Sequence, residues 1–150
     1  MTSSENASRR RWMGVLARAQ GTEIDTAWKA LGEPPAYDHL RRPETGLAMV
    51  RGRTGGDGAA FNLGEMTVTR CSVRLADGTV GHAYIAGRDT AHAERAAVLD
   101  ALLQDEARRA ALEEQVIGPL ERAQAERRDK AARKSAATRV DFFTMVRGET

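Results

Sequence analysis

An Asp-Gly turn between two strand-like runs is the feature that most limits how this chain can fold. Residues 65–75 (EMTVTRCSVRL) and 79–86 (TVGHAYIA) flank the tripeptide Ala-Asp-Gly at 76–78. Asp-Gly between two such runs is a strong signal for a β-hairpin. A shorter run at residues 46–51 (GLAMVR) precedes them and is separated from them by a glycine-rich loop at residues 52–58. The middle of the chain therefore predicts a small antiparallel sheet.

Helical periodicity precedes the sheet. Apolar residues recur twice at the i, i+3, i+4, i+7 spacing of an amphipathic helix, once after Ser8 and once after Thr22, which offers an N-cap. The apolar positions are Trp12, Val15, Leu16 and Ala19 in the first helix and Ile24, Ala27, Trp28 and Leu31 in the second. Gly32 and the Pro-Pro pair at 34–35 end the second helix. We predict two short helices here and disorder over residues 1–7.

A third helix is expected after the sheet. Asp89 can cap a helix over residues 90–106. The apolar face of that helix carries His92, Ala96, Leu99 and Leu103. Helical character continues to Val116, and the Gly-Pro pair at 118–119 is expected to interrupt it. The predicted fold class is α+β, a small antiparallel β-sheet flanked by N-terminal short helices and C-terminal helices, with residues 8–120 as the domain.

The C-terminal residues, 121–150, are predicted to form a polar helical spacer and an apolar docking segment. Residues 121–134 contain no apolar side chain larger than alanine, so they cannot bury a useful face. Apolar side chains then return at Val140, Phe142, Phe143, Met145 and Val146, followed by Arg147. Burying them is worth several kcal/mol, and with only 5% aromatic residues the chain's own core is expected to be thin. We expect docking on a neighbouring chain; pairing as an edge strand of its own sheet is the alternative.

Charge and cysteine content restrict the compartment and the partners. The formal net charge is only +2, and acidic residues alternate with basic ones along most of the chain, so nucleic acid is not expected as a partner. One cysteine cannot form an internal disulfide, which fits a reducing compartment. The sequence has neither a signal-like apolar region near its start nor a run of about 18 apolar residues. A cytoplasmic protein without a membrane partner is therefore expected.

Few side chains have an obvious chemical role. Cys71 lies on an apolar-leaning strand face without a local activating partner, so we interpret it as buried and structural. His39, His82 and His92 form no HExxH pattern and no CxxC accompanies them, so no metal site is expected in this chain alone. The loop at residues 52–58 lacks the Gly-Lys-Ser/Thr of a phosphate-binding loop, and we interpret it as a hairpin connection.

The start of the third helix is a candidate anion site. A helix N-terminus attracts anions, so Arg88, His92 and the free amides could hold a phosphate-like group. His92 and Glu94 are the candidates for a catalytic role there. The alternative, which we favour, is that Asp89 caps the helix and His92 is half buried at the end of the apolar face. Arg70, on the long strand, is a further candidate for binding a substrate anion, although its face could equally be solvated.

Five segments carry a family resemblance. They are RRWMGVLA (residues 10–17), ETGL (44–47), GEMTVTRCSVRL (64–75), DGTVGHAYIAGRDTAHAERAAVLDALLQ (77–104) and RVDFFTMVRGE (139–149). In residue identity and in order along the chain they closely resemble the PhnG family, the G subunit of the bacterial carbon–phosphorus lyase core complex. The chain departs from the pattern at Ala96, where some members have cysteine. Residues 105–134 match the family in length and helical character more than in residue identity.

The resemblance implies a subunit of phosphonate catabolism that assembles with the H, I and J subunits, and with the L protein for the first reaction. In that reaction a phosphonate such as methylphosphonate displaces adenine from MgATP and gives α-D-ribose 1-methylphosphonate 5-triphosphate. The I subunit carries the nucleosidase activity, and the J subunit, a radical SAM enzyme with an iron–sulfur cluster, later breaks the carbon–phosphorus bond. MgATP would then be a substrate of the assembled complex, with no cofactor in this chain.

Two roles within such a complex are compatible with the sequence. The expected one is an accessory or structural subunit that is inactive alone. The alternative is a subunit that contributes anion-binding or catalytic residues directly to a site shared with the I subunit. Arg88, His92 and Glu94 are the candidates for that direct role.

Overall fold

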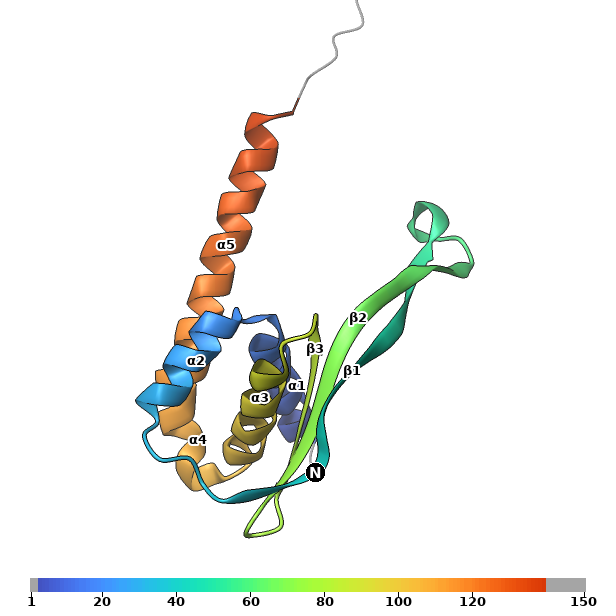
Figure 1. The fold of residues 1–150 in the computed structure, drawn as a ribbon. Helices are drawn as coiled ribbons and strands as arrows, with labels where there is room; N and C mark the ends of the chain where they lie inside the picture. The colour runs from blue at the N-terminus through green and yellow to red at the C-terminus, as the bar shows by residue number, and fades with distance from the viewer. Residues whose placement is uncertain (1–2, 140–150) are drawn as a thin grey trace, which may run out of the picture.

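A computed structural model describes residues 3–139 as a layer of helices packed on an antiparallel sheet, with two extensions from this body (Figure 1). The elements are α1 (Ser3–Arg18), α2 (Gly21–Ala30), β1 (Tyr37–Arg53), η1 (Thr54–Gly56), β2 (Ala60–Leu75), β3 (Val80–Ala86), α3 (Thr90–Leu103), α4 (Glu106–Leu112), a π-helical turn η2 (Glu113–Ile117) and α5 (Gly118–Ala137). The strand order within the described residues is β1-β2-β3. The predicted α+β class and the helix–sheet–helix order are confirmed.

The N-terminal helices start differently from the prediction. α1 begins at Ser3, so the prediction of disorder is wrong for residues 3–7. These residues carry no apolar repeat, but Glu5 in the first turn suits the positive end of the helix dipole. The carboxylate of Glu23 accepts a hydrogen bond from the backbone N–H of Gln20 (2.9 Å) at the start of α2, where Thr22 was the predicted cap. The predicted apolar residues Trp12, Val15, Leu16, Ala19 and Ile24 are buried.

α3 is the most enclosed element of the body. Every side chain over residues 96–103 is buried, because the sheet covers one side of the helix and α1, α2 and α4 contact the rest. The predicted apolar face is therefore only part of its buried surface. β3 lies against α3 so closely that a Cβ added to Gly81 would be 1.9 Å from the carbonyl oxygen of Ala97. Only glycine fits at that position of β3.

The first extension is formed by β1 and β2. β3 pairs with β2 only between Val68 and Arg74, whereas β1 pairs with β2 almost from end to end. Residues 46–67, which we call the hairpin arm, therefore continue as a two-stranded ribbon beyond β3 (Figure 1). At its tip Gly55 and Gly56 have φ values of 64° and 86°, which glycine adopts without strain.

Both of these strands are longer than predicted. β1 begins at Tyr37 rather than at residue 46, and its pairing with β2 shifts register between His39 and Arg41 and again between Arg41 and Glu44. It also contains Pro43, which is tolerated because β1 is an edge strand. These irregularities explain why the stretch lacks an alternating pattern. The glycine-rich loop is a hairpin connection, as predicted, but shorter.

The second extension is α5. α4, η2 and α5 follow one another without a break in helical backbone, so the predicted interruption at residues 118–119 is wrong. The backbone N–H of Gly118 bonds to the carbonyl of Glu113, five residues back. This wider turn precedes Pro119 and accommodates a residue that has no N–H of its own. All side chains over residues 128–139 are exposed, as expected for a solvated helix. The prediction is wrong for residues 121–127, most of which are partly buried because Gln124 donates to the carbonyl of Val15 (2.8 Å) and Arg127 pairs with Glu23.

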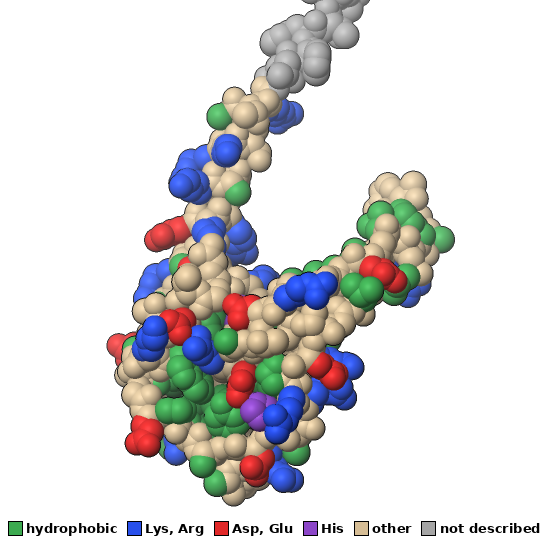
Figure 2. Space-filling view, in the orientation of Figure 1, with side chains coloured by type: hydrophobic (Ala, Val, Ile, Leu, Met, Phe, Trp, Pro, Cys, Tyr) green, Lys and Arg blue, Asp and Glu red, His purple; other side chains and the backbone are tan. Residues whose placement is uncertain are grey.

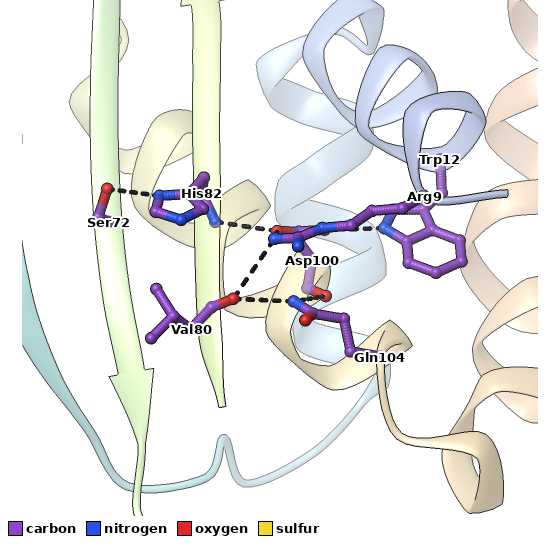
Figure 3. Close-up of polar contacts among 7 residues, drawn as sticks. All are labelled: Arg9, Trp12, Ser72, Val80, His82, Asp100 and Gln104. Carbon is purple, nitrogen blue, oxygen red and sulfur yellow. Dashed lines mark hydrogen bonds and ion pairs between the residues drawn. The ribbon is translucent and has the colours of Figure 1, made fainter. Parts of the chain in front are cut away.

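A buried carboxylate joins the helical layer to the sheet (Figure 3). Asp100 of α3 is 0% exposed. Its oxygens accept hydrogen bonds from Arg9 Nε (3.2 Å), Arg9 Nη2 (2.8 Å), Trp12 Nε1 (2.8 Å) and the backbone N–H of His82 (2.9 Å). Arg9 and Trp12 belong to α1, and His82 belongs to β3. One side chain therefore ties α3 to the preceding strand and to α1, which is far away in the sequence.

Replacing Asp100 with asparagine is expected to lower the free energy of unfolding by about 3 kcal/mol, because the guanidinium of Arg9 loses its buried counter-ion. Urea unfolding followed by tryptophan fluorescence measures the loss. Asp129→Asn, which changes an exposed carboxylate on α5, is the matched control and should leave the unfolding midpoint unchanged. An Asp100→Asn variant as stable as the wild type would show that this network does not hold α1 to the sheet.

Candidate functional site

The N-terminus of α3 is capped by the side chain of Asp89. Oδ1 of Asp89 accepts a hydrogen bond from the backbone N–H of His92 (2.9 Å), which makes Asp89 the N-cap, as predicted. Its other oxygen lies against the start of α2, where a Cβ on Gly21 would be 2.5 Å away. The carboxylate of Asp89 thus stands where the anion-site hypothesis placed a phosphate-like group.

His92 is buried between α3 and α1. The residue is only 5% exposed, and its Nε2 lies 2.7 Å from the carbonyl oxygen of Leu16. Because a carbonyl oxygen can only accept, Nε2 carries the proton and donates it. This arrangement agrees with the alternative in which Asp89 caps the helix, and His92 is buried more deeply than that alternative assumed.

Glu94 contacts the start of β1. Its Oε1 accepts a hydrogen bond from the hydroxyl of Tyr37 (2.8 Å) and lies 2.9 Å from Nε2 of His39. The rings of Tyr37 and His39 meet edge to face, with their centroids 5.6 Å apart. Burial, followed by the hydrogen bond to Glu94, raises the pKa of Tyr37 to about 12, so this hydroxyl stays a neutral donor near neutral pH. Glu94 therefore links α3 to the first strand.

The two arginines proposed for anion binding lie at the surface in different settings. Nε of Arg70 is 2.7 Å from a carboxylate oxygen of Glu44 on β1. Hydrogen bonds from Arg41 and Arg70 hold the pKa of Glu44 below its usual value. Arg70 alternates with the buried Cys71, so it lies on the sheet face opposite the helices. Arg88 is exposed, and within the described part of the chain no ion pair or hydrogen bond of its side chain is found.

The candidate residues do not converge on one site within this chain. His92 binds α1, Glu94 binds β1, and Arg70 binds Glu44 on the far face of the sheet. Each of these three side chains has a bond that stabilises the fold. Roles for them and for Arg88 in substrate binding or catalysis remain predictions.

Cys71 is a structural residue, as predicted. It is buried in the core, and its Sγ donates to the carbonyl oxygen of Arg41 (3.4 Å). Burial, with a smaller contribution from the charge of Glu94, raises the pKa of the thiol to about 11. The thiol is therefore protonated near neutral pH, which makes it a poor nucleophile.

The histidines lie in three separate places. His39 contacts Glu94, Nδ1 of His82 lies 2.8 Å from the hydroxyl of Ser72, and His92 contacts a backbone carbonyl. Over residues 3–139, no group of three or more His, Cys, Asp or Glu side chains is placed to hold a metal ion. None of the helices in that range is both long enough and apolar enough to cross a membrane.

The predicted docking segment lies outside the described residues. Its members are Val140, Phe142, Phe143, Met145, Val146 and Arg147. The choice between docking on a neighbouring chain and pairing with the chain's own sheet therefore stays a prediction. The polar spacer before it is described, and it is helical to Ala137.

An apolar surface that the sequence analysis missed is exposed on the hairpin arm. Of the seven large apolar side chains that are exposed in the described residues, five lie on the arm and are 40–65% exposed: Leu47, Met49, Phe61, Leu63 and Met66. Figure 2 shows apolar side chains along the arm and around its tip. An exposed apolar patch of this kind is typical of an interaction surface. The sequence does show these residues, but the predicted strand boundaries left Phe61 and Leu63 in a loop.

Known proteins match this chain along nearly its whole length. The family model described as "Phosphonate metabolism protein PhnG" matches residues 7–148, which include the body, the hairpin arm and α5. A relative from Rhizobium meliloti (strain 1021) is named alpha-D-ribose 1-methylphosphonate 5-triphosphate synthase subunit PhnG. It is 54% identical over 146 residues, which cover 95% of this chain and 91% of the relative. The resemblance noted in the sequence is confirmed, and the chain belongs to the PhnG family of phosphonate metabolism proteins.

Proposed function

We propose that this chain is an accessory, structural subunit of a synthase that makes α-D-ribose 1-methylphosphonate 5-triphosphate from MgATP and methylphosphonate. In this reaction an oxygen of the phosphonate forms a bond to C1 of the ribose while the bond from C1 to adenine breaks, and adenine leaves with a proton. The observation that carries the proposal is the 54% identity to a relative named as a subunit of this synthase. An identity of 54% over 95% of the chain means that the two proteins share a fold.

The internal bonds of the candidate residues support an accessory role over a direct one. A side chain that acts on MgATP or on a phosphonate must reach the substrate. His92 is buried with its ring bonded to Leu16, and Glu94 is bonded to Tyr37 and His39. The helix N-terminus beside them is capped by Asp89. These groups hold the subunit together, and other subunits would then supply the reacting groups.

The proposed partners are the H, I and J subunits of the carbon–phosphorus lyase core, with the L protein in the first reaction. MgATP is then a substrate of the assembled complex, this chain brings no cofactor of its own, and the reaction takes place in the cytoplasm. A subunit of this kind must offer surface to its neighbours. The exposed apolar side chains of the hairpin arm are surface suited to that purpose.

Reconstitution with and without this chain tests the proposed function. The remaining synthase subunits, supplied with MgATP and methylphosphonate, should form no α-D-ribose 1-methylphosphonate 5-triphosphate, and adding the purified chain should restore its formation. Phosphorus NMR follows the product and chromatography follows adenine. The chain alone should neither form this product nor release adenine from MgATP. Full synthase activity in its absence would contradict the proposal, and turnover by the isolated chain would make it an enzyme in its own right.

Replacing His92 with alanine separates the accessory role from the direct one. We expect the free energy of unfolding to fall by about 1–2 kcal/mol, because the buried carbonyl of Leu16 loses its donor. The synthase rate per assembled complex should stay nearly unchanged. Arg88→Ala, at an exposed position, examines the same anion-site hypothesis without disturbing the core. A rate loss on the order of 100-fold with assembly intact would instead assign these residues a direct role.

Removing residues 140–150 tests the predicted docking segment. The truncated chain should keep its helices and sheet, because the core cluster of the described residues reaches no further than Leu120. It should lose co-purification with partner subunits, since burial of the apolar side chains drives docking. Circular dichroism and tagged co-purification measure the two effects. Removal of residues 148–150 alone is the matched control, and full partner retention by the longer deletion would argue against docking.

A further inference from the structure

The hairpin arm presents apolar side chains on both of its faces. Leu47 and Met49 share one face of β1, whereas Met66, which is paired with the intervening Ala48, lies on the other face. Figure 2 shows further apolar side chains near the tip. Contact with one flat surface would leave the apolar side chains of the other face in water. The arm is therefore suited to a groove that has an apolar wall on each side.

The backbone edges of the arm are also open. β3 ends at Ala86, opposite Val68, and the last backbone hydrogen bond on that side runs from the N–H of Gly87 to the carbonyl of Thr67 (2.8 Å), so no strand pairs with β2 there over residues 60–66. β1 is at the edge of the sheet throughout. Register shifts interrupt the pairing of β1 with β2 around Arg41, near the body, and again within the arm between Val50 and Arg51. Such irregularities hinder the addition of another strand. The regularly paired stretch of the arm, residues 47–50 with residues 64–67, is thus the part of the sheet where an extended segment of another chain can pair.

α5 adds a charged surface on the same side of the molecule. The arm and α5 project beyond the same end of the body, and the space-filling view leaves a wide opening between them (Figures 1 and 2). The exposed residues 128–134 of α5 include four basic side chains, Arg128, Lys130, Arg133 and Lys134, against one acidic side chain, Asp129. A second copy of this chain would bring another basic helix to the opening, and the two basic helices would repel each other. A chain with an acidic surface would instead be attracted.

We propose that the hairpin arm is the docking element for a different subunit of the synthase, which receives the arm in an apolar groove and presents an acidic surface to α5. This inference rests on the proposed function, because it takes the occupant to be a synthase subunit. Burial of the arm removes most of the exposed large apolar side chains of the described residues from water. Apolar contacts on the arm then provide affinity, and charge on α5 orients the partner.

Two variants of the full chain test the arm. In the first, residues 48–66 are replaced by Asn-Gly, which joins the paired residues Leu47 and Thr67 through a two-residue turn. The second, Leu47→Ser with Leu63→Ser, keeps the length of the arm and removes its two most exposed apolar side chains. Leu40→Ser is the matched control, because Leu40 is half exposed on the same strand but lies outside the arm.

A charge variant, Lys130→Glu with Arg133→Glu, tests the contact of α5. Each tagged chain is co-expressed with the remaining synthase subunits, and co-elution and dissociation constants are measured at low and high salt. Circular dichroism and the thermal midpoint confirm that each variant is folded. Sedimentation of the isolated wild-type and arm-shortened chains reports self-association.

We expect both arm variants to bind on the order of 100-fold more weakly and Leu40→Ser to bind as the wild type does. The charge variant should lose on the order of 10-fold at low salt and less at high salt. Arm variants that co-elute in wild-type proportion overturn this inference alone, whereas a wild-type chain that co-elutes with no synthase subunit overturns the proposed function. An isolated chain that dimerises only when its arm is intact would make the occupant a second copy and overturn the assignment.

Discussion

The buried carboxylate of Asp100 is the interaction on which the rest of the structure depends. An unexposed charge is costly unless its charge and its lone pairs are compensated. Here the compensating donors come from α1, 91 residues away in the sequence, and from β3, 18 residues away. The helical layer and the sheet cannot separate without removing hydrogen-bond donors from this carboxylate. Gly81 completes the contact, because the absence of a side chain lets β3 approach the backbone of α3.

The body uses its most reactive side chains for its own cohesion. Cys71 is a protonated thiol in the core, His92 bridges two helices, and Glu94 holds the start of β1. The outward-facing side chains are of a different kind, since the hairpin arm exposes five large apolar side chains and the end of α5 is basic. This division between an inert interior and two exposed extensions is what a subunit needs when its role is to organise other chains.

The candidate site contains features that depend on neighbouring residues and features that depend on distant ones. Asp89 was identified as the cap of α3 because capping depends on a residue three positions away. The burial of His92 was underestimated because its partner, Leu16, is 76 residues distant. The arm was missed for a related reason. An exposed two-stranded ribbon has the same residue pattern as a strand in a sheet, and only the end of β3 decides where the third partner stops.

The sequence by itself determined the local elements and the family. The Asp-Gly hairpin, the apolar repeats of α1 and α2 and the cap of α3 follow from neighbours within a few positions, and the family follows from the order of residues along the chain. Only the tertiary structure decided that Asp100 is the central buried charge, that helical backbone continues through Pro119, and that two strands run on as an arm. The burial of Asp100 and the length of the arm depend on contacts between distant segments, and the continuation through Pro119 depends on the wider turn from Glu113 to Gly118. The pattern of residue types along the chain records none of these.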